Sequence, residues 1–349
     1  MRFSYAMLAD YPLTDSLSSI RKADELGFYA VYAPDETWHK DLWLLFAAAA
    51  AQTSQIRMGP SVSGVVLREP TLIAQAAATL DELTNGRAEV AVSSGNFGLL
   101  AGYHIDWAKT KPLSRVKEAV HVIRTLLDEG VITHDGEFFK YSGIFTFARP
   151  VQERLPVKMG AMRGPKSFQA AAEVSDGCHH ALSYCREAYD YMIEHCTLGA
   201  ERAGKNVQDL DLGAWIVFSV AEDGAVATDA ARSMVGLYAS AMPHEQLKRN
   251  GVDPKEMAPI IDAIGAGDMA KGFELTTPDL AERLSVAGTP EECVKKMQNE
   301  IAAAGVNHLI LGITDKALVK VLTGREIEGV PDVNTQLQLV HDRVMPAFA

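Results

Sequence analysis

The sequence predicts an α/β fold, a (β/α)8 barrel of the TIM type with insertions. Short apolar runs alternate with segments of helical period, which is the pattern of repeated β-α units around a parallel sheet. Eight such strands can be placed along the chain, the number that closes a TIM barrel. The 349 residues, 48% of them hydrophobic, suit one large closed core. We therefore expect a single domain over residues 1–349.

The first half of the barrel follows a regular alternation that begins with a strand. Strands and helices are expected in turn at 2–8, 14–28, 30–34, 42–53, 56–62, 70–86 and 88–94. Thr14 or Asp15 would cap the first helix, and Gly86 would end the third.

The second half carries two departures from the alternation. A helix over 113–130 precedes a hairpin over 132–144, because Asp135-Gly136 lies between residues of β type. Residues 241–285 are short helical segments joined by glycines, which we interpret as an insertion between strands seven and eight. It would be either a lid over the mouth or a packing subdomain. Strands five to eight are expected at 156–161, 177–182, 212–220 and 308–313.

Charge and hydropathy limit the kinds of molecule that the protein is expected to bind. The net charge is −12, and the basic residues are scattered, so we expect no binding of nucleic acid. No segment approaches the ~18 to 20 apolar residues of a membrane span, and the first apolar run is too short for a signal peptide. We expect a cytoplasmic protein that acts on a small molecule.

Ligands of a TIM barrel bind at the carboxyl ends of the strands, so the residues directly after each strand are the candidates. Glu36, Trp38 and His39 follow strand two, where a titratable pair beside an aromatic ring could shape a pocket; solvated loop residues are the alternative. The chain has no HExxH, no Walker loop, no GxGxxG and no Ser-His-Asp order that we can place. We expect no metal site.

The joint between strand five and its helix has the composition of a phosphate site. Glycines at a strand end let backbone N–H groups converge, and a helix beginning near Pro165 adds positive charge. Arg163 and Lys166 would complete the site. The alternative is a tight turn with Pro165 at the first helical position and Ser167 helping to cap.

The pair His179-His180 lies on strand six. Successive side chains of a strand alternate, so one ring should face the barrel interior and the other the helices. Either ring is a candidate active-site group, with a hydrogen-bonded core histidine as the alternative.

Four segments in order resemble the bacterial luciferase-like superfamily of flavin-dependent barrels: 78–96, 133–161, 164–177 and 286–311. Within it, the stretches 56–62, 68–70 and 105–127 are most similar to the deazaflavin (coenzyme F420) branch, particularly methylenetetrahydromethanopterin reductase.

The resemblance implies F420 as cofactor and a homodimer. It implies a cis peptide bond at Ser61–Val62, in a bulge behind the deazaflavin ring, and a phosphate site at the strand-five joint. The cofactor-binding candidates are Asp35, Ser61, Val62, Ser93, Ser94, Gly160, Ala161, Met162, Arg163, Gly164, His179 and His180.

The chain departs from this branch where the proton donors are expected. Ala6 and Asn96 stand where acids are usual, and Asp35-Glu36 replaces a frequent Asp-His. We therefore expect a hydride transfer to or from a small organic substrate in which Glu36 or His39 handles the proton and Asn96 hydrogen-bonds the cofactor or substrate.

Two alternatives remain open. One is a two-component monooxygenase that receives reduced FMN from a flavin reductase partner. The other is a flavin-holding protein that has lost the chemistry, since fold alone does not fix function.

Overall fold

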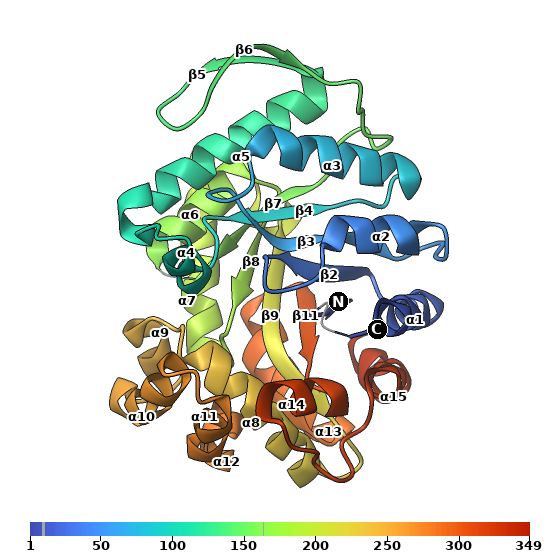
Figure 1. The fold of residues 1–349 in the computed structure, drawn as a ribbon, viewed down its shortest axis with the longest axis vertical. Coiled ribbons are helices and arrows are strands. Elements are labelled where there is room, and N and C mark those ends of the chain that lie inside the picture. The colour runs from blue at the N-terminus through green and yellow to red at the C-terminus, as the bar shows by residue number, and fades with distance from the viewer. Residues whose placement is uncertain (9–10, 163) are drawn as a thin grey trace.

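The computed structural model describes residues 1–8, 11–162 and 164–349. Eight parallel strands form a closed barrel in the order β9-β11-β1-β2-β3-β4-β7-β8, with β8 pairing back to β9 (Figure 1). The predicted TIM barrel is confirmed. The barrel strands are β1 Arg2–Ala6, β2 Ala30–Asp35, β3 Arg57–Gly64, β4 Val90–Ser93, β7 Val157–Ala161, β8 Gly177–Ala181, β9 Asp211–Val220 and β11 His308–Ile313.

Helices surround the barrel and cover its outer face (Figure 1). Side-chain caps fix several of their first turns, as where Asp41 accepts from the Leu44 N–H and Glu69 from the Thr71 N–H. The helices are α1 Leu13–Glu25, α2 Leu42–Ala50, α3 Pro70–Leu83, α4 Phe97–Gly102, α5 Pro112–Glu129, α6 Pro165–Val174, α7 Arg186–Arg202, α8 Gly224–Ala239, α9 His244–Arg249, α10 Pro254–Gly265, α11 Met269–Leu275, α12 Pro278–Arg283, α13 Pro290–Lys296, α14 Lys316–Thr323 and α15 Val333–Leu339.

The expected hairpin is confirmed as β5 Val131–Asp135 and β6 Lys140–Phe145, an antiparallel pair outside the barrel. It lies above α3 and α5 in Figure 1. The Glu118 carboxylate of α5 accepts from the Phe138 and Phe139 N–H groups, which fastens the turn of the hairpin to the helix.

Residues 241–285, expected as an insertion, contain α9 to α12, which gather beside α8 (Figure 1). They are followed by β10 Val286–Gly288, a short strand that pairs with the end of β9. β10 is not predicted by the sequence, because its three residues, two of them Ala and Gly, carry no strand pattern. Whether the segment acts as a lid stays a prediction.

Charged side chains lie inside the barrel, where a TIM barrel is usually filled by layers of aliphatic side chains. The Lys158 ammonium lies 2.6 Å from Glu89 Oε2 and contacts Asp211. His308 Nδ1 lies 2.9 Å from Asp211 Oδ1, and its Nε2 lies 2.6 Å from Ser4 Oγ. Both carboxylates are almost fully buried, so each depends on these partners for its stability.

Further polar groups extend this network toward the amino-terminal ends of the strands. Glu89 also accepts from the Tyr29 and Tyr32 hydroxyls at 2.6 and 2.5 Å and from Arg57 Nε at 2.6 Å. Arg2 lies 3.1 Å from Asp211. We call the connected set of Glu89, Lys158, Asp211 and their partners the core ion network.

The close approach of β3 to the segment before β4 gives a first testable prediction. A Cβ added at Gly59 would lie 1.8 Å from the Glu89 carbonyl oxygen, a backbone atom that cannot move aside. Gly59→Ala should therefore lower the free energy of unfolding by about 1–3 kcal/mol or more, measured by urea denaturation. Gly265→Ala, where an added Cβ meets nothing within 4 Å, should change it by about 1 kcal/mol or less. Equal stability of the two variants would contradict this packing.

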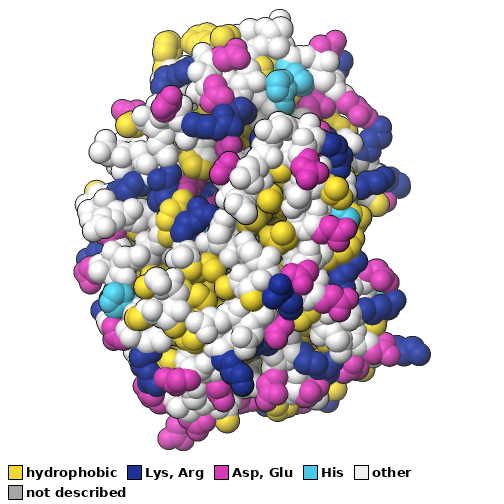
Figure 2. All heavy atoms as spheres, turned by 180° about the vertical axis from the view of Figure 1, so that it is seen from behind, with side chains coloured by type: hydrophobic (Ala, Val, Ile, Leu, Met, Phe, Trp, Pro, Cys, Tyr) yellow, Lys and Arg dark blue, Asp and Glu magenta, His cyan; other side chains and the backbone are white. Residues whose placement is uncertain are grey.

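The surface shows mixed charge. On the face seen in Figure 2, Lys and Arg side chains alternate with Asp and Glu, and no field of one sign gathers there. Within the described residues, none of the helices combines the length and apolar character needed to cross a membrane.

Candidate functional site

The three predicted catalytic residues meet at the carboxyl end of the barrel. Glu36 Oε2 lies 3.9 Å from His39 Nε2, in the loop after β2. Asn96 caps α4 by accepting from the Gly98 N–H at 2.9 Å, so its amide nitrogen is the group that donates to Glu36. Burial raises the pKa of the Glu36 carboxyl, against the opposing effects of His39 and the Asn96 bond. A carboxyl group whose pKa is raised in this way is suited to exchange a proton with a bound molecule.

Asp35 lies beside this group and is held by three side chains. Its Oδ2 accepts from Ser63 Oγ at 2.6 Å and from Trp43 Nε1 at 3.2 Å, and Arg68 Nε lies 3.6 Å away. The Arg68 guanidinium also stacks over the Trp43 ring. The role of Arg68 is not predicted by the sequence, because Arg68 and Asp35 follow two different strands and only the fold brings them together.

The floor of the mouth is formed by β3, β4 and β7. The Ser61–Val62 peptide bond is cis, as the family resemblance implies, and β3 bulges there against β4. A Cβ added at Gly160 would lie 2.8 Å from Val62 Cγ1 and 3.5 Å from Ser93 Cβ, so the glycine lets β7 pass close to this bulge. Ser93 Oγ accepts from the Gly95 N–H, which shapes the next turn.

His179 faces the barrel interior beneath this floor, and His180 faces outward, as the strand alternation predicts. His179 Nδ1 lies 3.2 Å from Ser61 Oγ, and its Nε2 lies 3.6 Å from Asp211 Oδ2. Burial lowers the pKa of His179 to about 4, so the ring is neutral at neutral pH. His179 thus connects the floor to the core ion network.

The structure does not bring His180 to the mouth, which corrects its expected role as a cofactor contact. Its Nδ1 donates to the Ala161 carbonyl at 2.9 Å, and its Nε2 accepts from Ser183 Oγ at 2.7 Å. The ring packs edge-on against Phe168 of α6 and Tyr189 of α7. His180 is a hydrogen-bonded core histidine.

The β7–α6 joint has an open helix start. Gly164 precedes Pro165 with φ +149°, and no side chain caps α6. Ser167 Oγ donates to the Gly164 carbonyl at 2.7 Å, so it does not cap the helix as the tight-turn alternative expected. Ala161 is buried and Met162 is half-buried against the core. Arg163 lies outside the described residues.

A cavity of ≈ 680 Å³ lies between two segments at the mouth. The first wall runs from α4 into the turn Trp107–Thr110, and Trp107 Nε1 donates to Ser94 Oγ at 2.9 Å. The second wall is the connection from α8 to α9. We call this space the mouth cavity; its lining residues are Phe97, Ala101, Ile105, Asp106, Trp107, Ala108, Ser240, Ala241, Met242, Pro243 and His244.

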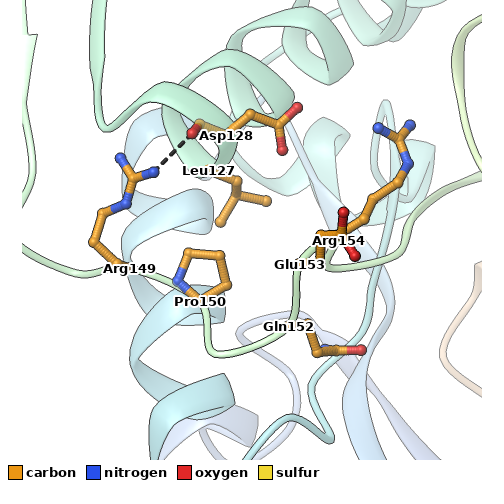
Figure 3. Close-up of a pocket in the computed structure, with 7 residues that line it drawn as sticks. All are labelled: Leu127, Asp128, Arg149, Pro150, Gln152, Glu153 and Arg154. Carbon is orange, nitrogen blue, oxygen red and sulfur yellow. Dashed lines mark hydrogen bonds between the residues drawn. The ribbon is translucent and has the colours of Figure 1, made fainter.

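A second hollow of ≈ 540 Å³ lies at the opposite end of the barrel, before β7 (Figure 3). Arg149 donates to the Asp128 backbone carbonyl at 2.7 Å, and Arg154 lies 2.8 Å from the Asp176 carboxylate. Residues at this end of a TIM barrel usually contribute to stability, whereas ligands bind at the carboxyl ends of the strands. The mouth cavity is therefore the better candidate site.

One cluster has the ligand types of a metal site. Atoms of His179, Asp211 and His308 lie within 4.8 Å of one another. However, the Lys158 ammonium contacts Asp211 and supplies the positive charge that a metal ion would bring. We therefore interpret this cluster as part of the core ion network.

Comparison with known proteins agrees with this geometry. Residues 1–308 match the family described as luciferase-like monooxygenase. The 5,10-methylenetetrahydromethanopterin reductase of Methanolobus tindarius is 28% identical over 94% of this chain and 100% of its own length. The F420-dependent glucose-6-phosphate dehydrogenase of Kineococcus radiotolerans is 27% identical over 95% of this chain and 94% of its own.

A solved structure supports the fold. The coenzyme F420 dependent tetrahydromethanopterin reductase of Methanopyrus kandleri superposes with a TM-score of 0.88 at 24% identity, covering 100% of this chain and 99% of that one. The resemblance to the reductase branch is thus confirmed. Because the family match covers most of the chain, the protein belongs to the luciferase-like monooxygenase family and is an enzyme of that family.

Proposed function

We propose that this protein is an F420-dependent oxidoreductase that moves a hydride between the cofactor and a small organic substrate. The observation that carries the chemistry is the partly buried Glu36, bonded to Asn96 beside the mouth cavity. The choice of F420 is supported by relatives that are named for it and that match along nearly the whole chain.

The residues at the mouth fit such a cofactor. At the uncapped start of α6, Pro165 has no N–H and the N–H groups of Ser167 and Phe168 bond to the Gly164 carbonyl, which leaves the Lys166 N–H as the candidate donor to a phosphate. The bulge at Ser61 and Val62, approached by Gly160, offers a flat backbone surface to a ring. When bound, F420 would supply a hydride donor or acceptor at its C5 atom.

Glu36 is the residue that handles the proton. In the reducing direction it gives its proton to the substrate heteroatom as the neighbouring carbon gains the hydride; in the oxidising direction it takes the proton back. Asn96 orients the carboxyl through its amide donor, and the His39 Nε2 atom lies 3.9 Å from the Glu36 carboxylate.

The proposal is tested by titrating the apo-protein separately with oxidised F420 and with FMN, followed by tryptophan fluorescence. We expect F420 to bind with a Kd in the micromolar range or tighter, about −8 kcal/mol or better, and FMN to bind more weakly.

The opposite preference would overturn the proposal. It would favour an FMN-dependent monooxygenase, which oxygen consumption with a flavin reductase would then test. Binding of F420 without turnover of imines, ketones or activated alkenes would instead favour a flavin-holding protein.

A further inference from the structure

The lining of the mouth cavity is mostly apolar. Phe97, Ile105, Trp107 and Met242 supply the larger surfaces, and alanines and Pro243 supply most of the rest. Its volume of ≈ 680 Å³ falls within the range of sites that enclose a small organic molecule. The cavity is open to solvent on one side and can therefore receive a ring or a short hydrocarbon chain against its apolar walls.

This cavity adjoins the proposed catalytic residues. Asn96 directly precedes Phe97 and caps the helix that forms the first wall. A Cβ added at Gly98 would lie 3.7 Å from the Trp38 ring, so this wall also touches the loop that carries Glu36 and His39. The cavity and these polar groups therefore share the wall formed by α4.

The charge of the lining restricts what the cavity accepts. Neither Lys nor Arg is among the described residues that line it. Its one carboxylate, Asp106, caps the Trp107–Thr110 turn through the Ala108 N–H and lies 3.4 Å from Lys109 Nζ. The Arg68 guanidinium does not line the cavity and lies 3.6 Å from Asp35. Among the described lining residues His244 is the one side chain that can carry a positive charge, so a phosphate or carboxylate bound here would meet no lysine or arginine of the lining.

We infer that the mouth cavity is the substrate site and that it selects neutral, ring-bearing apolar molecules over phosphorylated ones. That the bound molecule is a substrate rests on the proposed function. The inference goes beyond that function because it specifies the charge of the substrate. A phosphorylated sugar, the substrate named for one relative, is excluded by the same argument.

The test compares two probes with the same ring and different charge, 1-naphthol and 1-naphthyl phosphate. Their affinities are measured by calorimetry on the protein with and without bound F420. We expect 1-naphthol to bind at least about tenfold more tightly, which corresponds to about 1.4 kcal/mol. Equal affinity, or tighter binding of the phosphate, would overturn the inference.

Variants locate the binding. Ala101 is exposed on the first wall, so Ala101→Trp should fold normally and fill the cavity. It should weaken 1-naphthol binding about tenfold or more. Ala101→Lys should bring the naphthyl phosphate affinity up to or above that of naphthol, since it adds the missing cation. Ala51→Lys, on the exposed end of α2, is the matched control and should change neither affinity.

The outcomes separate this inference from the proposed function. If F420 fails to bind but 1-naphthol still binds the wild-type protein more tightly than Ala101→Trp, the assignment of F420 as cofactor is wrong and the assignment of the cavity as a binding site is retained. If F420 binds and Ala101→Trp leaves naphthol affinity unchanged, the cavity is not the binding site and the inference is wrong.

Discussion

Replacing Glu36 with glutamine should lower kcat by a factor of about 10² to 10⁴, the usual contribution of a positioned acid or base. Glutamine has nearly the same shape and can still accept from Asn96, but it cannot exchange a proton. F420 affinity should change little, because Glu36 acts on the substrate side of the proposed reaction. Steady-state kinetics with F420 absorbance, together with the binding titration, measure both quantities.

The pH dependence provides an independent check on Glu36. Burial raises its pKa above the ordinary value of 4.5. In the reducing direction the protonated form is required, so the rate should fall as pH rises through this raised pKa. In the oxidising direction the rate should fall as pH drops through it.

This dependence of the rate on pH should disappear in Glu36→Gln. Glu25→Gln, an exposed position on α1, is the control and should leave both rate and profile unchanged. A loss of less than about threefold in Glu36→Gln would remove Glu36 from the mechanism, and the same substitution tests at His39 would follow.

Replacing Lys158 with methionine should have the largest effect on stability, a loss of about 3–5 kcal/mol in the free energy of unfolding. Methionine fills similar space but leaves Glu89 and Asp211 without their shared cation. Both carboxylates are almost fully buried, so water cannot replace that charge. Denaturation in urea at neutral pH measures the loss.

Two further variants make this prediction specific. Lys140→Met removes an exposed ion pair with Asp135 and should cost about 1 kcal/mol or less. Adding Glu89→Gln to Lys158→Met should recover part of the stability, because it removes one of the two buried carboxylates that have lost the Lys158 ammonium; Glu89 alone would keep only Arg57 as a cationic partner. Failure of either expectation would mean that packing, and not charge, dominates at Lys158.

The acid sensitivity of the wild-type protein follows from the same network. Burial alone would raise the pKa of Glu89, but Lys158 and then Arg57 hold it at about 2. A carboxyl with a depressed folded-state pKa stabilises the protein above its unfolded value, near 4.5, and this contribution is lost as pH falls toward 2. Lys158→Met should move this loss to higher pH.

Most of the barrel could be predicted from local patterns. Apolar runs and helical periods located all eight barrel strands, and the β11 prediction agrees at both ends. The carboxyl ends of the strands meet at one face of a TIM barrel. The sequence alone could therefore place Glu36, His39 and Asn96 in one candidate site. The third helix ends earlier than predicted, at Leu83, because the Thr84 hydroxyl returns to the Leu80 carbonyl and the chain then turns through left-handed Asn85 and Gly86.

Long-range pairings could not be predicted in the same way. Lys158, Glu89 and Asp211 stand out as charges in or beside apolar strands, but their register across the barrel is needed to pair them. The second wall of the mouth cavity comes from residues 240–244, far along the chain from α4, and no pattern in either segment points to the other.

Barrel closure has a consequence for how the chain matures. β1 pairs on one side with β2 and on the other with β11, whose first residue, His308, also completes the contacts of Asp211. A nascent chain leaving the ribosome therefore holds its first strand half-paired until the last strand has emerged. Until then the edges of β1 and β9 are open to pairing with other chains, so the late stages of synthesis are when aggregation is most to be expected.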